Sequence, residues 1–274
     1  MKLQMTAAIV AIIAIAAACG GADDGVSDDV IDAQYEALDA AYEADPFGPQ
    51  APRDITSTAG TNPITFEEAP PYTEMNLCNI HFHEGAEHLG GNYTTYAGNG
   101  DGEGFGSGYL YDGELSDEEL AEFDGEVGAD EHGGDLQPGD TIEIHYVHST
   151  DPISPGPTLG ACLASDDSSP QLRVEAQVFV LVNDPAAASL VDLTLVEEVG
   201  GLFQAVNIPN DTGTPVNYAG STTGPSYNET GSPFMVSWSV RPDVMKVDIS
   251  SVAAWLAENE FDRRIWHVPS TQHM

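Results

Sequence analysis

The chain has 274 residues, of which 45 are acidic and only seven are Lys or Arg, so its formal net charge at pH 7 is −38. This balance excludes a nucleic-acid partner, because no basic surface is available to meet phosphate groups. It also disfavours direct binding to anionic lipid headgroups. So acidic a surface keeps a protein soluble and suits a saline environment.

The first 18 residues have the features of an export signal. Lys2 is the only charge before an apolar run that ends in Ala16-Ala17-Ala18. A basic start, a short apolar stretch and small residues before a cleavage point are typical of a signal peptide, and the run is too short for a comfortable membrane span. The next residue, Cys19, resembles the lipidated Cys of bacterial lipoproteins. We therefore expect an exported protein of the bacterial periplasm or cell envelope, attached to a membrane only through a lipid anchor at Cys19. Simple secretion with a free Cys19 is the alternative.

Residues 19–62 are acidic, rich in Ala and interrupted by Pro. Residues 28–43 could form a short helix, but the composition favours a flexible tether between Cys19 and the folded part. We place the folded part at residues 63–274, as a single domain.

Two short stretches, residues 78–88 and 143–148, hold five of the eight His residues. In residues 76–83, His81 and His83 are two positions apart, so on a strand they point to the same face. Residues 141–148 alternate as a half-buried strand does, which places Glu143 and His145 on one face. A lone His on a strand is usually structural. Three imidazoles from two strands, with carboxylates on the same faces, instead predict a catalytic zinc site.

The remaining pattern predicts a β-dominated protein, mostly β with a few short helices, built as a single domain on a large central β-sheet. Glycine-rich residues 90–108 are expected to be loop, and residues 101–104 lack the spacing of an EF-hand. The expected strands are residues 172–182, apolar enough to be central, and residues 233–240, which contain Trp238. The expected helices are residues 116–123, with Ser116 and Glu119 as a capping box, and residues 250–260, capped by Ser250 or Ser251. Residues 189–199 and 201–208 are expected to add strand and short helix.

Two Cys residues, Cys78 and Cys162, remain beyond Cys19. In an oxidising compartment such a pair predicts one disulfide. Two free buried thiols are the alternative. A disulfide beside the first His pair would stiffen the strand that carries it.

Several motifs together resemble the metal core of α-type carbonic anhydrases. They are Asn79-Ile80-His81-Phe82-His83, then Glu87-His88, then Glu143-Ile144-His145-Tyr146-Val147-His148. Further along, Tyr218-Ala219-Gly220-Ser221-Thr222-Thr223-Gly224-Pro225 is similar to the family's Gly-Ser-Leu-Thr-Thr-Pro-Pro segment, and Met235-Val236-Ser237-Trp238 to its Val-x-Trp strand. Cys78 and the long strand at residues 172–182 resemble the δ-class more closely. The motifs cover about residues 76–256.

This resemblance implies a fold similar to that of α-carbonic anhydrase and a reversible hydration of carbon dioxide to bicarbonate and a proton, by hydroxide held on one zinc ion per chain. Cobalt or cadmium could substitute for the zinc. The implied roles are zinc ligands for His81, His83 and His145; support of those imidazoles for Asn79 and Glu143; orientation of the hydroxide for Thr223 and Glu87; and an apolar wall for carbon dioxide for Val147, Val174, Val236 and Trp238.

The sequence departs from the family pattern at three places. Thr222 stands where a Leu normally precedes the orienting Thr, and Gly224 and Pro225 replace the residues that follow it. No His precedes His81 to carry protons out, so His132, a carboxylate or buffer itself would have to do so.

His88 and His148 match hydrogen-bonded structural positions of the family and are not expected to be ligands.

Two other functions fit part of the pattern. A cupin-like metalloprotein would use His81, His83 and His145 with Glu87 as a fourth ligand, but it leaves the Thr223 and Trp238 segments unexplained. A non-enzymatic zinc-binding lipoprotein would need the same His residues and no apolar pocket.

Overall fold

The computed structural model describes residues 54–56, 58, 67–97, 108–128, 136–157, 159–163, 170–221, 235–259, 261 and 266–267. The strands are β1 (Asn76–Glu84), β2 (Thr95–Tyr96), β3 (Tyr109–Leu110), β4 (Thr141–Ser149), β5 (Leu172–Val182), β6 (Val196–Val199), β7 (Leu202–Ala205), β8 (Val216–Ser221), β9 (Met235–Val240), β10 (Met245–Asp248) and β11 (Trp266–His267). The helices are η1 (Tyr72–Glu74), η2 (Leu159–Cys162), α2 (Leu190–Leu193) and α3 (Ile249–Glu258).

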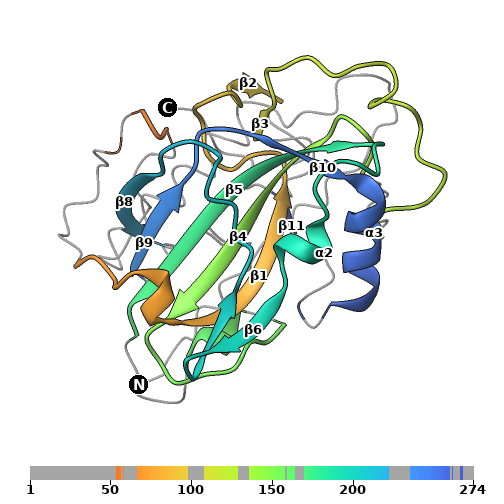
Figure 1. The fold of residues 1–274 in the computed structure, drawn as a ribbon. Coiled ribbons are helices and arrows are strands. Elements are labelled where there is room, and N and C mark those ends of the chain that lie inside the picture. Colours follow the sequence, from red (N-terminus) through yellow and green to blue (C-terminus); the bar gives the residue numbers. More distant parts are fainter. Residues whose placement is uncertain are drawn as a thin grey trace, which may run out of the picture.

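One seven-stranded mixed sheet dominates the structure, in the order β11-β1-β4-β5-β9-β8 (Figure 1). The central strand β4 is antiparallel to both of its neighbours, β1 and β5. On the far side of β5, β9 pairs with its first half and β10 with its second half, both in parallel. Two small hairpin sheets, β2-β3 and β6-β7, complete the strand content. The β-dominated fold class predicted from the sequence is confirmed.

The two faces of the sheet carry two separate cores. On one face, Ile80, Phe82, Ile144 and Tyr146 pack under α2, α3 and the β6-β7 hairpin. On the other face, Val147, Val174 and Trp238 belong to a second apolar cluster. All 11 residues of β5 are buried, as expected for a central strand covered on both faces. Alternate residues of β1 and β4 therefore serve different cores, and the His residues at odd positions lie on the second face.

Four strands predicted from the sequence are present at close to their predicted bounds. Residues 76–83 and 141–148 correspond to β1 and β4, residues 172–182 to β5, and residues 233–240 to β9. Residues 189–208 resolve into the short helix α2 and the β6-β7 hairpin. Within the described parts of the chain, no helix has the length and apolar character needed to cross a membrane.

The C-terminal helix α3 is present, but its predicted cap is wrong. Asp248, and neither Ser250 nor Ser251, occupies the N-cap position, and its Oδ1 accepts from the Ser250 amide at 3.3 Å. Aspartate is among the best N-caps because its carboxylate accepts from an otherwise free amide. The apolar spacing works as predicted, since Trp255 packs against Phe82 with ring centroids 5.8 Å apart.

The predicted helix at residues 116–123 is also wrong, because the segment forms only one turn. The capping box exists: the Ser116 amide donates to Glu119 Oε2 at 2.8 Å, and the Glu119 amide to Ser116 Oγ at 3.2 Å. However, the carbonyl groups of Glu119 and Ala121, which a longer helix would use, accept from Asn183. Asn183 follows β5, so a long-range contact stops the helix.

Several predictions lie outside the described residues and stay predictions. They are the signal peptide at 1–18, the anchor at Cys19, nearly all of the tether at 19–62 and the domain boundary at 63, the loop at 101–104, His132 and Thr223.

Candidate metal centre

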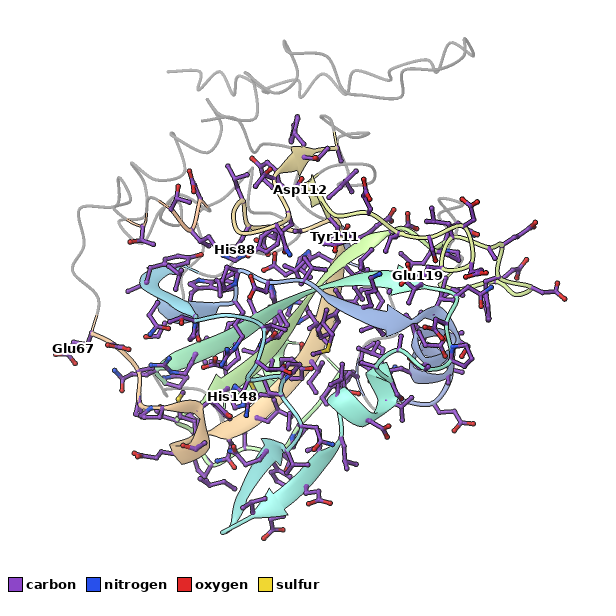
Figure 2. All side chains as sticks on the ribbon, turned by 45° about the horizontal axis from the view of Figure 1, so that its top comes forward. Glu67, His88, Tyr111, Asp112, Glu119 and His148 are labelled. Atoms are coloured by element: carbon purple, nitrogen blue, oxygen red, sulfur yellow. A yellow bond between two sulfur atoms is a disulfide. The ribbon has the colours of Figure 1, made fainter. Side chains whose placement is uncertain are left out.

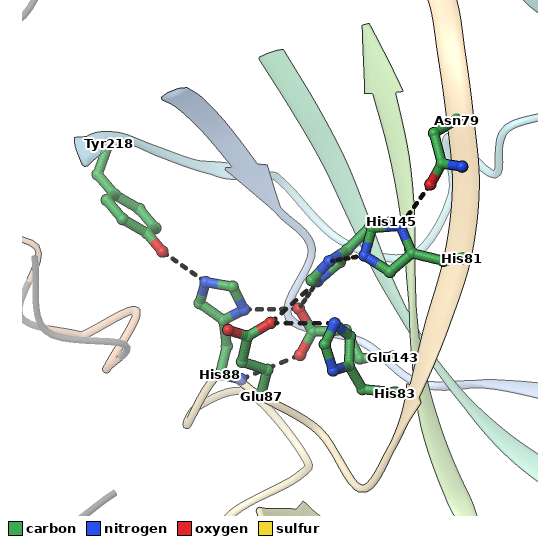
Figure 3. Close-up of polar contacts among 8 residues, drawn as sticks. All are labelled: Asn79, His81, His83, Glu87, His88, Glu143, His145 and Tyr218. Carbon is green, nitrogen blue, oxygen red and sulfur yellow. Dashed lines mark hydrogen bonds and ion pairs between the residues drawn. The ribbon is translucent and has the colours of Figure 1, made fainter. Parts of the chain in front are cut away.

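Strands β1 and β4 bring three imidazoles together on one face of the sheet (Figure 3). His81 lies opposite His145, and His83 lies opposite Glu143, so the i, i+2 pairs of both strands point the same way. Each of the three histidines can offer one nitrogen such that these atoms lie within 4.8 Å of one another. All three side chains are buried. The structure thus groups the three residues that the sequence predicted as zinc ligands.

Asn79 controls the protonation pattern of His81. Its Oδ1 lies 2.7 Å from His81 Nδ1, and its amide Nδ2 donates to the Gly156 carbonyl at 2.9 Å. Because the amide nitrogen is held by a carbonyl, which can only accept, the amide oxygen must face the imidazole. His81 therefore carries its proton on Nδ1 and presents the lone pair of Nε2.

Glu143 controls His145 in the same way. Its Oε1 accepts from His145 Nε2 at 2.9 Å and from His88 Nδ1 at 2.6 Å, while Oε2 accepts from the His88 amide at 3.0 Å. Burial acts to raise the pKa of Glu143, but the adjacent His88 and His145 outweigh it and hold that pKa well below its usual value. An ionised Glu143 can only accept, so His145 presents the lone pair of Nδ1.

These two lone-pair nitrogens, His81 Nε2 and His145 Nδ1, are 3.3 Å apart. A tetrahedral zinc ion at about 2.0–2.1 Å from each ligand nitrogen separates two of them by about 3.3–3.4 Å. Burial, and then the neighbouring His145 and His83, lower the pKa of His81 well below its ordinary value and keep that imidazole neutral. Neutral imidazoles with fixed tautomers, at this spacing, fit a zinc ion.

Glu87 lies beside the imidazoles and outside the three-histidine group. Its Oε2 is 3.5 Å from His145 Nε2 and 3.7 Å from His83 Nε2. His145 Nε2 is the nitrogen that donates a hydrogen bond to Glu143. Glu87 therefore approaches this edge of the His145 ring, and not Nδ1, whose lone pair lies near His81 Nε2. The position does not favour Glu87 as a fourth ligand of the cupin kind.

His88 and His148 occupy different environments, and Figure 2 shows them well apart. His88 is buried between Glu143 and the hydroxyl of Tyr218, which donates to His88 Nε2. His148 is three residues after His145, so it points to the opposite face, where its Nδ1 donates to the Tyr146 carbonyl at 3.0 Å. Burial lowers the pKa of His148 to about 3.

The four predicted wall residues lie together beside the histidines. Val147, Val174, Val236 and Trp238 are all buried and share one cluster. Val174 pairs with Val147 on β4 and with Trp238 on β9, so the three side chains lie on the same face of the sheet. The ring of Trp238 is 5.1 Å from that of His145. An apolar surface therefore adjoins the position where the three imidazoles converge.

The predicted disulfide between Cys78 and Cys162 is present, with Cα atoms 4.9 Å apart. Cys78 sits at an irregularity in the β1-β4 pairing, between Leu77 and Asn79. The bridge ties η2 to the strand that carries His81 and His83.

Two contributors to the site received no role from the sequence. The sequence could have indicated a role for Tyr218, because this residue stands in the segment that resembles the family. It is also two positions after Val216 on a strand, so the two side chains point to the same face. Gly156 contributes a backbone carbonyl, for which no side-chain pattern exists. Thr223 lies outside the described residues.

A family model described as Delta carbonic anhydrase matches residues 72–251, which is well over half of the chain. No curated protein and no solved structure matches the chain. The matched region contains β1, β4, β5, β8 and β9, and with them every residue of the three-histidine group and of the apolar wall.

Proposed function

Because this chain belongs to the delta carbonic anhydrase family, we propose that it catalyses the zinc-dependent, reversible hydration of carbon dioxide to bicarbonate and a proton. The observation that carries the proposal is the convergence of His81, His83 and His145, two of them with tautomers set by Asn79 and Glu143. The cofactor is one zinc ion per chain, and cobalt or cadmium could replace it.

A zinc ion bound by three neutral imidazoles lowers the pKa of a water ligand to about 7 and so supplies a nucleophile at neutral pH. The chain's own part is to keep the imidazoles neutral and oriented. Asn79 and Glu143 do this through hydrogen bonds to the far nitrogens of His81 and His145. Fixing ligand orientation in advance removes reorganisation from the reaction.

The apolar wall is the proposed binding surface for carbon dioxide. Val147, Val174, Val236 and Trp238 present no charge, which suits a neutral gas and disfavours ordered water. The product bicarbonate is an anion, so the same wall would hold it poorly and favour its release. Residues from three adjacent strands form this wall, so it is rigid.

Thr223 is proposed to orient the nucleophile. Its hydroxyl would accept a hydrogen bond from the nucleophile and donate a hydrogen bond to Glu87. The location of Glu87 beside the imidazoles supports this arrangement. For the released proton, His132, a surface carboxylate or the buffer is the proposed acceptor.

We also propose that the protein is exported and anchored through a lipid on Cys19. The Cys78–Cys162 disulfide supports export, because such bonds persist in oxidising compartments such as the bacterial periplasm.

The decisive experiment is stopped-flow measurement of carbon dioxide hydration with a pH indicator, with the zinc content of the same sample determined in parallel. We expect fast hydration that is lost on chelation and restored by zinc. His145→Ala should lose zinc and activity together, whereas Thr223→Ala should keep zinc and lose most turnover. Glu197→Gln, an exposed change on β6, is the control and should match the wild type. Fully zinc-loaded wild-type protein without hydration activity would contradict the proposal and favour a zinc-binding lipoprotein.

A further inference from the structure

The loop after β4 is attached to the metal-binding strand at several points. The Asn76 side-chain amide donates to the Asp151 carbonyl at 3.0 Å, and the Gly156 amide donates to the Cys78 carbonyl at 3.0 Å. The hydroxyl of Ser149 donates to the Cys162 carbonyl at 2.7 Å. The disulfide adds a covalent link at Cys162. We call residues 151–163, of which all but residue 158 are described, the clamp loop.

One contact connects this loop to the metal centre. The Gly156 carbonyl accepts from Asn79 Nδ2, and Asn79 Oδ1 accepts from His81 Nδ1. If the Asn79 amide rotated by half a turn, its NH₂ group would face His81 Nδ1. That nitrogen would then have to accept, which moves the ring proton to Nε2 and removes the lone pair from the metal position. The Gly156 carbonyl prevents this rotation because it can only accept.

We propose that the Gly156 carbonyl is a positioning group for His81, and that the Cys78–Cys162 disulfide holds it in place, so that the chain reaches its full zinc affinity only after the disulfide has formed. This inference rests on the proposed zinc function. Cys78 is adjacent to Asn79, and Cys162 ends the helix that closes the clamp loop, so the bond restrains both partners of the Asn79–Gly156 contact.

The redox step is ordinary thiol–disulfide exchange. The two thiols of Cys78 and Cys162 lose two electrons and two protons as one S–S bond forms, and a disulfide of an oxidant is reduced to two thiols. Both sulfurs are buried in the folded protein. Exchange is therefore expected during folding, before the clamp loop closes.

The test compares full-length oxidised protein with a Cys78→Ala/Cys162→Ala variant, both stripped of metal. Long-range ¹H–¹⁵N spectra of the imidazoles report which nitrogen of His81 carries the proton. We expect one tautomer, protonated at Nδ1, in the oxidised protein and a mixture in the variant. Zinc affinity, measured by competition with a chromophoric chelator, should fall about tenfold. This is the lower end of the usual effect for groups that hold a ligand, because Asn79 itself remains.

A second variant leaves the disulfide intact. A Cβ on residue 156 would lie 2.9 Å from the Cβ of Ala161, so Gly156→Ala must displace the clamp loop. Ala161→Gly removes the opposing atom. We expect Gly156→Ala to mix the His81 tautomers and weaken zinc binding, and the double variant Gly156→Ala/Ala161→Gly to recover both. Ala161→Gly alone is the matched control and should behave as the wild type.

Thermal unfolding of each sample shows that it is folded at the temperature of measurement. If the cysteine variant does not fold, the Gly156→Ala pair decides. An unchanged His81 tautomer together with zinc affinities within twofold of the wild type would overturn the inference. Failure of the proposed function is a separate result, because oxidised wild-type protein would then bind no zinc or hydrate no carbon dioxide, whatever its tautomer.

Discussion

Glu143 links two imidazoles at the metal centre, since one of its oxygens accepts from both His88 and His145. We expect Glu143→Gln, which keeps the shape but replaces one oxygen by an NH₂ donor, to set that donor against either the His88 backbone amide or the two imidazoles. Zinc affinity should fall about 10–100-fold. Chelator competition measures this, with the exposed change Glu197→Gln as control. Equal affinities in the two variants would show that Glu143 does not orient His145.

We expect the protein to lose stability in acid because His148 is buried in its neutral form. Its pKa is about 3 in the folded protein, because of burial, and about 6.5 when unfolded. The unfolded chain therefore binds more protons between these values. The stabilisation is complete above pH 6.5 and falls by up to about 1.4 kcal/mol per pH unit as the pH drops towards 3.

Replacing His148 by Phe removes this titration. We expect the free energy of unfolding of His148→Phe to depend less steeply on pH than that of the wild type between pH 6.5 and 4, as measured by urea denaturation at each pH. Tyr72→Phe is the control, because its ring lies 5.3 Å from that of His148 and the change leaves the imidazole in place. If the free energies of unfolding of His148→Phe and wild type depended equally on pH, the lowered pKa of His148 could not be the cause of the acid sensitivity.

At the scale of elements, the end of β10 and the start of α3 share one residue. Asp248 pairs with Val182 as the last residue of β10 and caps α3 through the Ser250 amide. We expect Asp248→Ala to lower the free energy of unfolding by about 1 kcal/mol. Chemical denaturation measures the loss. Glu258→Ala, at the exposed last turn of α3, should cost nothing, and an equal loss in both variants would argue against a capping effect.

The disulfide acts between elements that are far apart in the chain. Cys78 and Cys162 are 84 residues apart, so the bond restricts a long loop in the unfolded state. The chain-entropy relation gives about 4–5 kcal/mol for such a loop. We expect reduced protein to unfold at a correspondingly lower urea concentration than oxidised protein. Coincident unfolding curves, with thiol content confirmed by mass spectrometry, would refute the estimate.

For the whole molecule, the charge of −38 sets the response to salt. The basic side chains in the described part of the chain are all used to fasten loops: Arg173 binds the carbonyls of residues 69 and 70, Arg241 those of residues 210 and 213, and Lys246 pairs with Glu119. Most acidic groups are therefore left to repel one another. We expect the melting temperature to rise between 0.05 and 1 M NaCl, because salt screens this repulsion. A fall, measured by calorimetry, would mean that the few ion pairs dominate.

Much of the fold and of the site could be predicted because the relevant geometry is local. Residues two apart on a strand share a face, so His81 with His83, and Glu143 with His145, were paired without any knowledge of the fold. The strands β1, β4, β5 and β9 followed from their apolar patterns in the same way. The pairing of Cys78 with Cys162 needed only the count of cysteines and the inferred compartment.

The tertiary structure alone decided the features that depend on distant parts of the chain. The register that places His81 opposite His145 spans 64 positions and includes an irregularity at Cys78. Asn183 stops the helix at residues 116–123, although that segment has an intact capping box. The group that fixes the Asn79 amide is a backbone carbonyl, which every residue possesses. Side-chain type and spacing therefore determined which residues could bind the metal, whereas hydrogen bonds between distant segments determined how those residues are held.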